Sequence, residues 1–522
     1  MRPGRLFLIG VAIGGVAVAI SFASRILFNG PYLPELAASA VFSLVPGFLE
    51  SRAVENLGPL AKDTTFLVAS IALALVLGLV PVVLERFRLV PTKRIPAALV
   101  FLATTYIVML GLGVLFLALT QVSTQPIDLR SLLLGFLIPS VAFGMLMGAT
   151  GLSGKTILPS MYPTERMKGG TDRKRRLFIK SAVAAATAAA ILYYGVGFLF
   201  SKQGTVSVTA GQEAGQVLAS RVTPNSDFYR VDINVFAPSV DVGGWTLNLH
   251  GLVSSPMRLD YNRLTSLPSA ERYATLECVS NKVGGDLMST ALWKGVPLKD
   301  VLTMAGVNPQ ADYVVFRCYD GYDVGIPLDR AMQADCILAY EMNGEKLPTE
   351  HGYPLRAIVP GLYGMMNAKW ITEIEVVSGT YQGFWQRRGW TNVATYNTGS
   401  TIITPGDSPL RDRFSLPGSA GAITGAAVPI IGAAFAGDRG IQQVEVSTDG
   451  GNNWETASLY DPLSKNTWVF WKLEWNPTSS GDYRLMVRAT DGTGKAQVAT
   501  LSDPFPNGAT GYSVVDVRVS SG

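Results

Sequence analysis

Apolar residues are concentrated in the first 200 positions of this chain. Five apolar stretches there approach the roughly 20 residues that a helix needs to cross a hydrocarbon core of about 30 Å. They lie at 6–22, 65–84, 95–119, 132–151 and 177–200. A sixth stretch, 36–49, is short and interrupted by Pro46, so we expect an interfacial or re-entrant segment there. The pattern predicts an N-terminal α-helical membrane domain with about five spans.

Basic residues lie in alternate loops between these stretches, which is the positive-inside pattern of membrane proteins. Four lie at 86–94, between the second and third stretches, and eight lie at 155–180, before or at the start of the fifth. The segment 121–130 holds only one acidic and one basic residue. We therefore expect the N-terminus in the cytoplasm and everything after residue 200 outside it. The same distribution argues against nucleic-acid binding.

The apolar stretches contain few groups that could do chemistry. Both histidines of the chain, His250 and His351, follow them, so no paired ligands for a b-type haem are expected and no haem is predicted. Ionisable residues are almost missing there as well, which favours an anchor over an ion pump. Gly10 and Gly14 form a small-xxx-small pair, typical of close helix packing or of a generic glycine-rich membrane helix.

The basic run before the fifth stretch, KRRLFIK at 174–180, resembles a twin-arginine export signal. It departs from that signal because Lys174 stands where Ser or Thr is usual, and because the run is internal. Simple positive-inside charge is the alternative interpretation. The resemblance implies that the following domain folds and acquires a cofactor before export.

After a polar linker the chain changes character. Short strand-like runs alternate with turns and a few helical segments from 222 to about 377, which predicts an α+β domain. One of the helical segments is expected to end near Gly306. Regularly spaced strands follow, including a hairpin at 441–459, and favour an immunoglobulin-like β-sandwich. We therefore place a membrane domain at 1–203, a linker at 204–221, the α+β domain at 222–417 and the sandwich at 418–522.

Cys278 lies between an apolar run and a Gly-Gly turn, in TLECVSNKVGG. The chain has only 3 cysteines, so a disulfide framework is not expected. A thiolate in a polar turn can serve as nucleophile, redox centre or metal ligand. Cys318 and Cys336 lie inside apolar strand-like runs and are expected to be structural.

Four stretches, at 223–253, 276–287, 338–376 and 445–454, together resemble the sulfite oxidase family of molybdopterin oxidoreductases. The resemblance covers about 222–520 and says nothing about the apolar stretches. It implies a molybdenum–molybdopterin cofactor with the Cys278 thiolate as metal ligand, a role that suits a soft sulfur donor. It also implies two-electron oxygen-atom transfer and a possible homodimer through the sandwich.

The resemblance also implies roles for further residues. His351, Arg356 and Lys369 fall on cofactor-binding positions; without the resemblance, His351 would be interpreted as a turn residue and Arg356 as a surface strand residue. Tyr229 and Arg230 would face the cofactor or substrate pocket, where Arg230 would stabilise negative charge. The remaining candidates are Asn225 and Asp323 for the cofactor and Trp390 for catalysis.

Two departures from the family concern the substrate. Trp390 stands about where animal and plant sulfite oxidases have a tyrosine after a WQRR-like run, and Val469 stands where a second arginine is expected. Losing a cation weakens the case for sulfite, and an indole suggests a more apolar or differently shaped substrate.

The leading prediction is a multi-pass membrane protein with an extracytoplasmic catalytic domain. It would act on a small oxo-acid or sulfur-containing substrate and exchange electrons with a separate cytochrome or quinone-linked partner. The alternatives are a reductase of sulfoxides or similar oxo-compounds, and a non-catalytic membrane-anchored binding protein.

Overall fold

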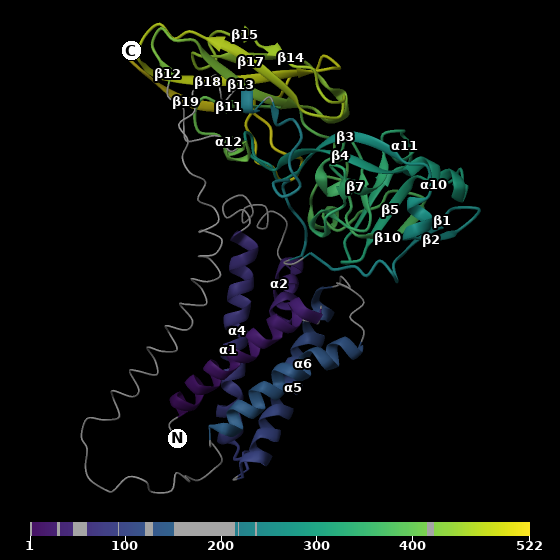
Figure 1. The fold of residues 1–522 in the computed structure, drawn as a ribbon, viewed down its shortest axis with the longest axis vertical. Helices are drawn as coiled ribbons and strands as arrows, with labels where there is room; N and C mark the ends of the chain where they lie inside the picture. The colour runs from purple at the N-terminus through teal and green to yellow at the C-terminus, as the bar shows by residue number, and fades with distance from the viewer. Residues whose placement is uncertain are drawn as a thin grey trace. The chain divides into compact units, whose positions relative to one another are not determined.

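The computed structural model divides the chain into two compact units (Figure 1). One is built mainly from Met1–Ala40, Lys62–Gln121 and Pro126–Val206, and the other mainly from Ser207–Gly522. The structure describes residues 3–28, 32–44, 60–91, 93–120, 129–150, 215–217, 219–234, 237–414 and 422–521.

The described part of the first unit is helical. Its helices are α1 (Pro3–Phe28), α2 (Leu33–Leu44), α4 (Leu60–Arg86), α5 (Arg94–Thr120) and α6 (Leu129–Ala149). Among the described residues, three segments are long and apolar enough to cross a membrane: Pro3–Arg25, Thr65–Arg86 and Arg94–Phe116. The apolar helix at Leu133–Ala149 is shorter. Three of the five predicted spans therefore have candidate helices, and the fourth coincides with the shorter apolar helix. The fifth and the KRRLFIK run lie outside the described residues.

Small residues bring α1 and α4 close together. A Cβ atom added to Gly10 would lie 2.7 Å from Pro81 Cγ, and one added to Gly14 would lie 3.0 Å from the Ala74 carbonyl oxygen. Both distances are shorter than normal contacts, so the two glycines allow the approach of the helices. Of the two interpretations of the small-xxx-small pair, the structure therefore favours close helix packing.

The second unit begins with two five-stranded sheets, one ordered β2-β1-β10-β5-β6 and the other β3-β4-β7-β8 with β9 on β7. Strand β1 is parallel to β10, and the other pairs are antiparallel. The strands are β1 (Thr246–Gly251), β2 (Met257–Asp260), β3 (Ala270–Glu277), β4 (Met288–Pro297), β5 (Tyr313–Cys318), β6 (Asp323–Pro327), β7 (Ile337–Met342), β8 (Glu345–Lys346), β9 (Arg356–Ile358) and β10 (Ile371–Val377). Short helices α9 (Tyr261–Thr265), α10 (Leu298–Ala305) and α11 (Leu328–Ala331) lie between them. This mixture confirms the α+β prediction.

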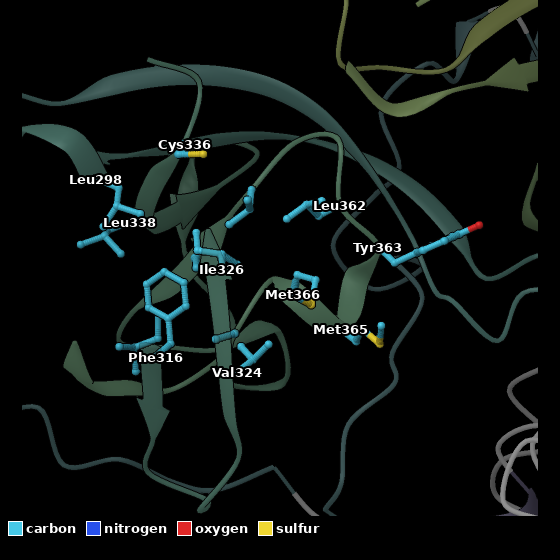
Figure 2. Close-up of a cluster of buried hydrophobic side chains, with 14 of the residues drawn as sticks. Leu298, Phe316, Val324, Ile326, Cys336, Leu338, Leu362, Tyr363, Met365 and Met366 are labelled. Carbon is cyan, nitrogen blue, oxygen red and sulfur yellow. The ribbon is translucent and has the colours of Figure 1, made fainter. Parts of the chain in front are cut away.

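One large hydrophobic cluster joins these sheets to the short helices. Figure 2 shows Phe316 of β5 and Ile326 of β6 on one side of it and Met366 on the other, all completely buried. Leu298, the first residue of α10, belongs to the same cluster. Helix α10 ends at Ala305, and the following Gly306 has a φ of 65° in the left-handed region that favours glycine, as the sequence predicted.

Two more sheets form the C-terminal region, ordered β11-β13-β17-β16 and β12-β19-β18-β14-β15. The strands are β11 (Gly399–Thr404), β12 (Ala422–Ile423), β13 (Val428–Phe435), β14 (Ile441–Ser447), β15 (Glu455–Thr456), β16 (Ser458–Leu459), β17 (Val469–Trp475), β18 (Gly481–Asp491) and β19 (Ser513–Ser520). Strands β14 and β15 pair in an antiparallel manner, which confirms the predicted hairpin. The region is β-rich, and its first sheet already includes β11, upstream of residue 418.

A loop of this region attaches along the edge of β3. The backbone N–H of Thr275 donates to the Asn466 carbonyl at 2.9 Å, and the N–H of Trp468 donates to Thr275 Oγ1 at 2.9 Å. Ser464 Oγ also donates to the Tyr273 carbonyl at 2.8 Å. Because β3 ends directly before Cys278, the C-terminal region supports the strand that leads into the thiol.

Candidate functional site

Cys278 is the first residue after β3 and lies in a tightly bonded turn. Its N–H donates to the Leu287 carbonyl at 2.9 Å, and its carbonyl accepts the N–H of Asn281 at 3.0 Å. The Asn281 side chain accepts the N–H of Leu287 at 3.0 Å, which closes the turn. A Cβ on Gly285 would lie 2.4 Å from this side chain, so glycine is required there. The Cys278 side chain is 7% exposed, with Sγ 3.0 Å from Ser280 Oγ.

The other two cysteines differ from Cys278 in their surroundings. Cys318 ends β5 and Cys336 precedes β7, and both are buried within the hydrophobic cluster. Burial raises the pKa of both thiols, in Cys336 to about 12. None of the three cysteines forms a disulfide. These surroundings fit the structural role predicted for Cys318 and Cys336.

Arg356 opens β9 and is buried without a carboxylate partner among the described residues. Its Nη1 donates to the His351 carbonyl at 3.1 Å, and its guanidinium carbon lies 5.1 Å from the centre of the Trp293 ring. Nε is buried and has no hydrogen-bond partner. Burial lowers the pKa of Arg356 to about 10, so the group is still cationic at neutral pH. An unpaired buried cation of this kind is stabilised when an anion binds.

His351 lies five residues before Arg356, at the end of a 3₁₀ turn (Thr349–His351). Its Nε2 is 2.8 Å from the Asn225 carbonyl oxygen, and the Phe228 ring packs edge-on at 5.3 Å. Burial lowers the pKa of His351 to about 4, with the Arg356 charge adding to the effect. The ring is therefore neutral near pH 7, and it donates its Nε2 proton to the carbonyl because that oxygen can only accept.

Lys369 and Arg230 share a carboxylate. Lys369 Nζ donates to Asp232 Oδ2 at 3.0 Å and to the Glu350 carbonyl at 3.2 Å, and it lies 4.4 Å from the centre of the Trp370 ring. Arg230 Nε donates to the same Asp232 oxygen at 2.9 Å. Burial lowers the pKa of Lys369 to about 8, although Asp232 opposes the shift.

Tyr229 and Asn225 lie on the segment that precedes β1. A Cβ on Gly364 would lie 2.4 Å from the Tyr229 hydroxyl and 3.2 Å from the Glu277 carbonyl, so this hydroxyl lies close to the start of the Cys278 turn. The Asn225 side chain instead bonds the loop after β7: Nδ2 donates to the Met342 carbonyl at 3.3 Å, and Oδ1 accepts from Asn343 at 2.8 Å. The structure therefore brings the Tyr229 hydroxyl near the thiol turn, whereas the Asn225 side chain is bonded to the loop after β7.

Asp323 and Trp390 make contacts that the sequence did not predict. Asp323 accepts two hydrogen bonds from Arg387, at 2.8 and 2.6 Å, and one from the Tyr381 hydroxyl at 2.5 Å. Its carboxylate thereby fixes the position of the segment after β10 that contains Tyr381 and Arg387. Trp390 is 6% exposed and packs edge-on against Phe505 with ring centres 5.1 Å apart. Their predicted roles toward cofactor and substrate stay predictions.

Three buried or half-buried acids were missed at the sequence level: Asp232, Asp320 and Glu277. Glu277 precedes Cys278 and accepts a hydrogen bond from Asn281 at 2.9 Å, while burial raises its pKa to about 7. It lines a cavity of about 40 Å³ between the Cys278 turn and the C-terminal β-region. An acid at the end of a strand is ordinarily a surface residue, so no sequence signal distinguished Glu277.

Comparisons with known proteins match the second unit. The family model of the oxidoreductase molybdopterin binding domain matches residues 234–385, and that of the Mo-co oxidoreductase dimerisation domain matches 393–502. Sulfite oxidase from Arabidopsis thaliana is 30% identical over 332 residues, covering 54% of this chain and 83% of that protein. An uncharacterized oxidoreductase of Bacillus subtilis (strain 168) is 35% identical over 150 residues, covering 29% of this chain and 74% of that protein.

Other relatives are matched over less of their length or at lower identity. Mitochondrial sulfite oxidase from Mus musculus is 30% identical over 318 residues, covering 54% of this chain but only 58% of its own length. Among solved structures, the sulfane dehydrogenase SoxCD from Paracoccus pantotrophus is 24% identical, with a TM-score of 0.49, and the match covers 58% of this chain and 85% of that one.

The residues described above fit the cofactor that these relatives imply. Cys278 would supply the thiolate, and Arg356, with its unpartnered buried Nε, would suit the anionic end of a molybdopterin. Lys369 has two acceptors for its three protons, which leaves one for an anion. When bound, the molybdenum–molybdopterin cofactor would supply a metal that exchanges two electrons. On its molybdopterin-binding and dimerisation domains and its likeness to sulfite oxidases, the chain belongs to the sulfite oxidase family of molybdenum–molybdopterin oxidoreductases.

Proposed function

We propose that this protein is a membrane-anchored oxidoreductase that transfers an oxygen atom to or from a small oxo-acid or sulfur-containing substrate. Three apolar helices of spanning length support the anchor. The alternating basic loops support five spans and a catalytic domain on the extracytoplasmic side, reached through twin-arginine export. The domain bounds 1–203, 204–221, 222–417 and 418–522, and the immunoglobulin-like character of the last, belong to the same proposal.

The observation that carries the proposal is the group of cations formed by Arg356, Lys369 and Arg230, in which buried Arg356 has no carboxylate partner among the described residues. Arg356, Lys369 and Arg230 contribute three cations, and Asp232 is the acid that pairs with two of them. We propose that Cys278 binds the metal and that His351, Arg356 and Lys369 hold the pterin and its phosphate. Further proposed contacts with the cofactor or the substrate come from Asn225, Tyr229, Arg230, Asp323 and Trp390.

Arg230 is the proposed contact for the substrate. Its side chain is 36% exposed, whereas that of Lys369 is 11% exposed, so Arg230 is the cation that a solute reaches more easily. A guanidinium in this place would stabilise an oxyanion through charge-assisted hydrogen bonds. Val469 is 4% exposed and offers no second cation, which limits the charge available for sulfite.

Two directions of reaction follow from the same site. Oxidation of sulfite takes up one water and yields sulfate, two protons and two electrons, and the electrons pass to a separate cytochrome or quinone-linked partner. Reduction of a sulfoxide consumes two protons and two electrons and yields a sulfide and water. The dimerisation-domain match supports a homodimer. A purely non-catalytic binding role is set aside because the chain belongs to a family of oxidoreductases.

The test uses the full chain, purified in detergent from cells that make molybdopterin. Near-stoichiometric molybdenum is expected in the wild-type protein, with loss of the metal in Cys278→Ser and retention in the matched control Cys336→Ser. Loaded protein is then assayed with sulfite and an artificial electron acceptor, and with sulfoxides and a reduced dye. Turnover in neither assay would refute the substrate proposal, and turnover in one decides the direction.

A further inference from the structure

We propose that Asp232 is a positioning residue that holds the side chains of Lys369 and Arg230 in place beside the cofactor site. The inference rests on the proposed function, because both cations are candidates for binding cofactor or substrate. No role was assigned to Asp232 from the sequence.

The geometry of Asp232 joins two distant parts of the chain at one atom. Its Oδ2 accepts Arg230 Nε at 2.9 Å, from two residues away, and Lys369 Nζ at 3.0 Å, from 137 residues away. Its Oδ1 accepts the backbone N–H of Asn234 at 3.0 Å, which fixes the carboxylate plane. The side chain is 2% exposed, so water competes weakly and both charge-assisted bonds are strengthened.

Asp232 also favours the protonated form of the Lys369 amine. The pKa of Lys369 is lowered to about 8, because burial and the charges of Arg356 and Arg230 lower it more than Asp232 raises it. Without Asp232 the amine would be buried among like charges and would lose its proton more readily. Arg230, which is partly exposed, would then be free to turn toward solvent. Both changes weaken the hold on an anionic cofactor.

Asp320 provides a matched control. It is a second buried carboxylate attached to the same segment, since it accepts Asn234 Nδ2 at 2.7 Å and the N–H of Tyr322 at 3.1 Å. Its hydrogen bonds in the structure go to neither Lys369 nor Arg230. Asp320→Asn therefore removes a neighbouring buried acid while it leaves the bridge between the cations intact.

The experiment measures how fast the full chain releases molybdenum and pterin during dialysis, for the wild type, Asp232→Asn and Asp320→Asn. Removal of a charge-assisted hydrogen bond of this kind predicts release about 10-fold faster, or more, in Asp232→Asn. Asp320→Asn is expected to stay close to the wild type. Melting temperatures of the cofactor-free proteins show whether each variant folds.

A double-variant comparison separates positioning from a general effect on packing. If Asp232 acts through Lys369, adding Asp232→Asn to Lys369→Met accelerates release far less than it does in the wild type. Equal release by Asp232→Asn and Asp320→Asn, or full additivity with Lys369→Met, would overturn the inference. A wild-type protein that contains no molybdenum would instead refute the cofactor site itself, so the two failures are distinguishable.

Discussion

Replacing Thr275 by Val tests whether the C-terminal β-region supports the strand that leads to Cys278. Valine keeps the shape of threonine but removes the hydroxyl that accepts the N–H of Trp468 at 2.9 Å and pairs with Thr290 Oγ1 at 2.5 Å. Thr275 is 1% exposed and Trp468 is 2% exposed, so water cannot replace the lost acceptor. Leaving one buried donor unsatisfied costs about 1–3 kcal/mol of the free energy of unfolding.

The assay for this variant follows from the positions of the tryptophans. All 9 lie between residues 245 and 475, so tryptophan fluorescence reports on the second unit alone, even in detergent. A loss of about 2 kcal/mol predicts a fall in melting temperature of roughly 3 °C or more. The control is Thr303→Val, which removes an exposed hydrogen bond to the Lys299 carbonyl and should change stability by no more than about 0.5 kcal/mol. Equal melting temperatures for the two variants would refute the reasoning.

Three further predictions concern charged groups of the site. Arg356→Met should raise the melting temperature of the cofactor-free protein, because it removes an unpaired buried cation, and should abolish molybdenum binding; a lower melting temperature together with retained metal would contradict the assignment. His351 has a folded-state pKa of about 4 against an ordinary value of 6.5, so stability present above pH 6.5 should be lost as pH falls toward 4, by on the order of 3 kcal/mol at most. Urea unfolding of the wild type and His351→Gln across this range checks it, and an identical pH dependence of the two would count against a buried neutral ring. Asp323→Asn should free Arg387 and speed proteolysis near that residue, while unchanged cleavage would show that the ion pair does not hold this segment.

Local patterns in the sequence predicted the features that depend on neighbours along the chain. The hairpin after β14 follows from alternation around an Asp-Gly-Gly turn, and the end of α10 follows from Gly306. The sandwich was expected to begin at 418 because β11 has no alternation to detect. Its residues are almost all buried, including the polar side chains of Ser400, Thr401 and Thr404, so burial in this strand does not follow the polarity of the sequence.

Contacts between distant residues could not be read from the sequence in the same way. The bridge from Asp232 to Lys369 spans 137 positions, and the pairing of Asp323 with Arg387 spans 64. Both depend on how the sheets bring loops together, which no local period encodes. The motif resemblance singled out Lys369 and Asp323, but it did not indicate the partners that fix them.

The most direct test of the account is the X-ray absorption spectrum of molybdenum in the purified full chain. The account predicts that the Cys278 thiolate is bonded to the metal, so the wild-type spectrum should contain one more sulfur neighbour than molybdopterin alone supplies. Any metal remaining in Cys278→Ser should lack that neighbour, while Cys336→Ser should match the wild type. Equal sulfur coordination in Cys278→Ser and the wild type would contradict the central claim.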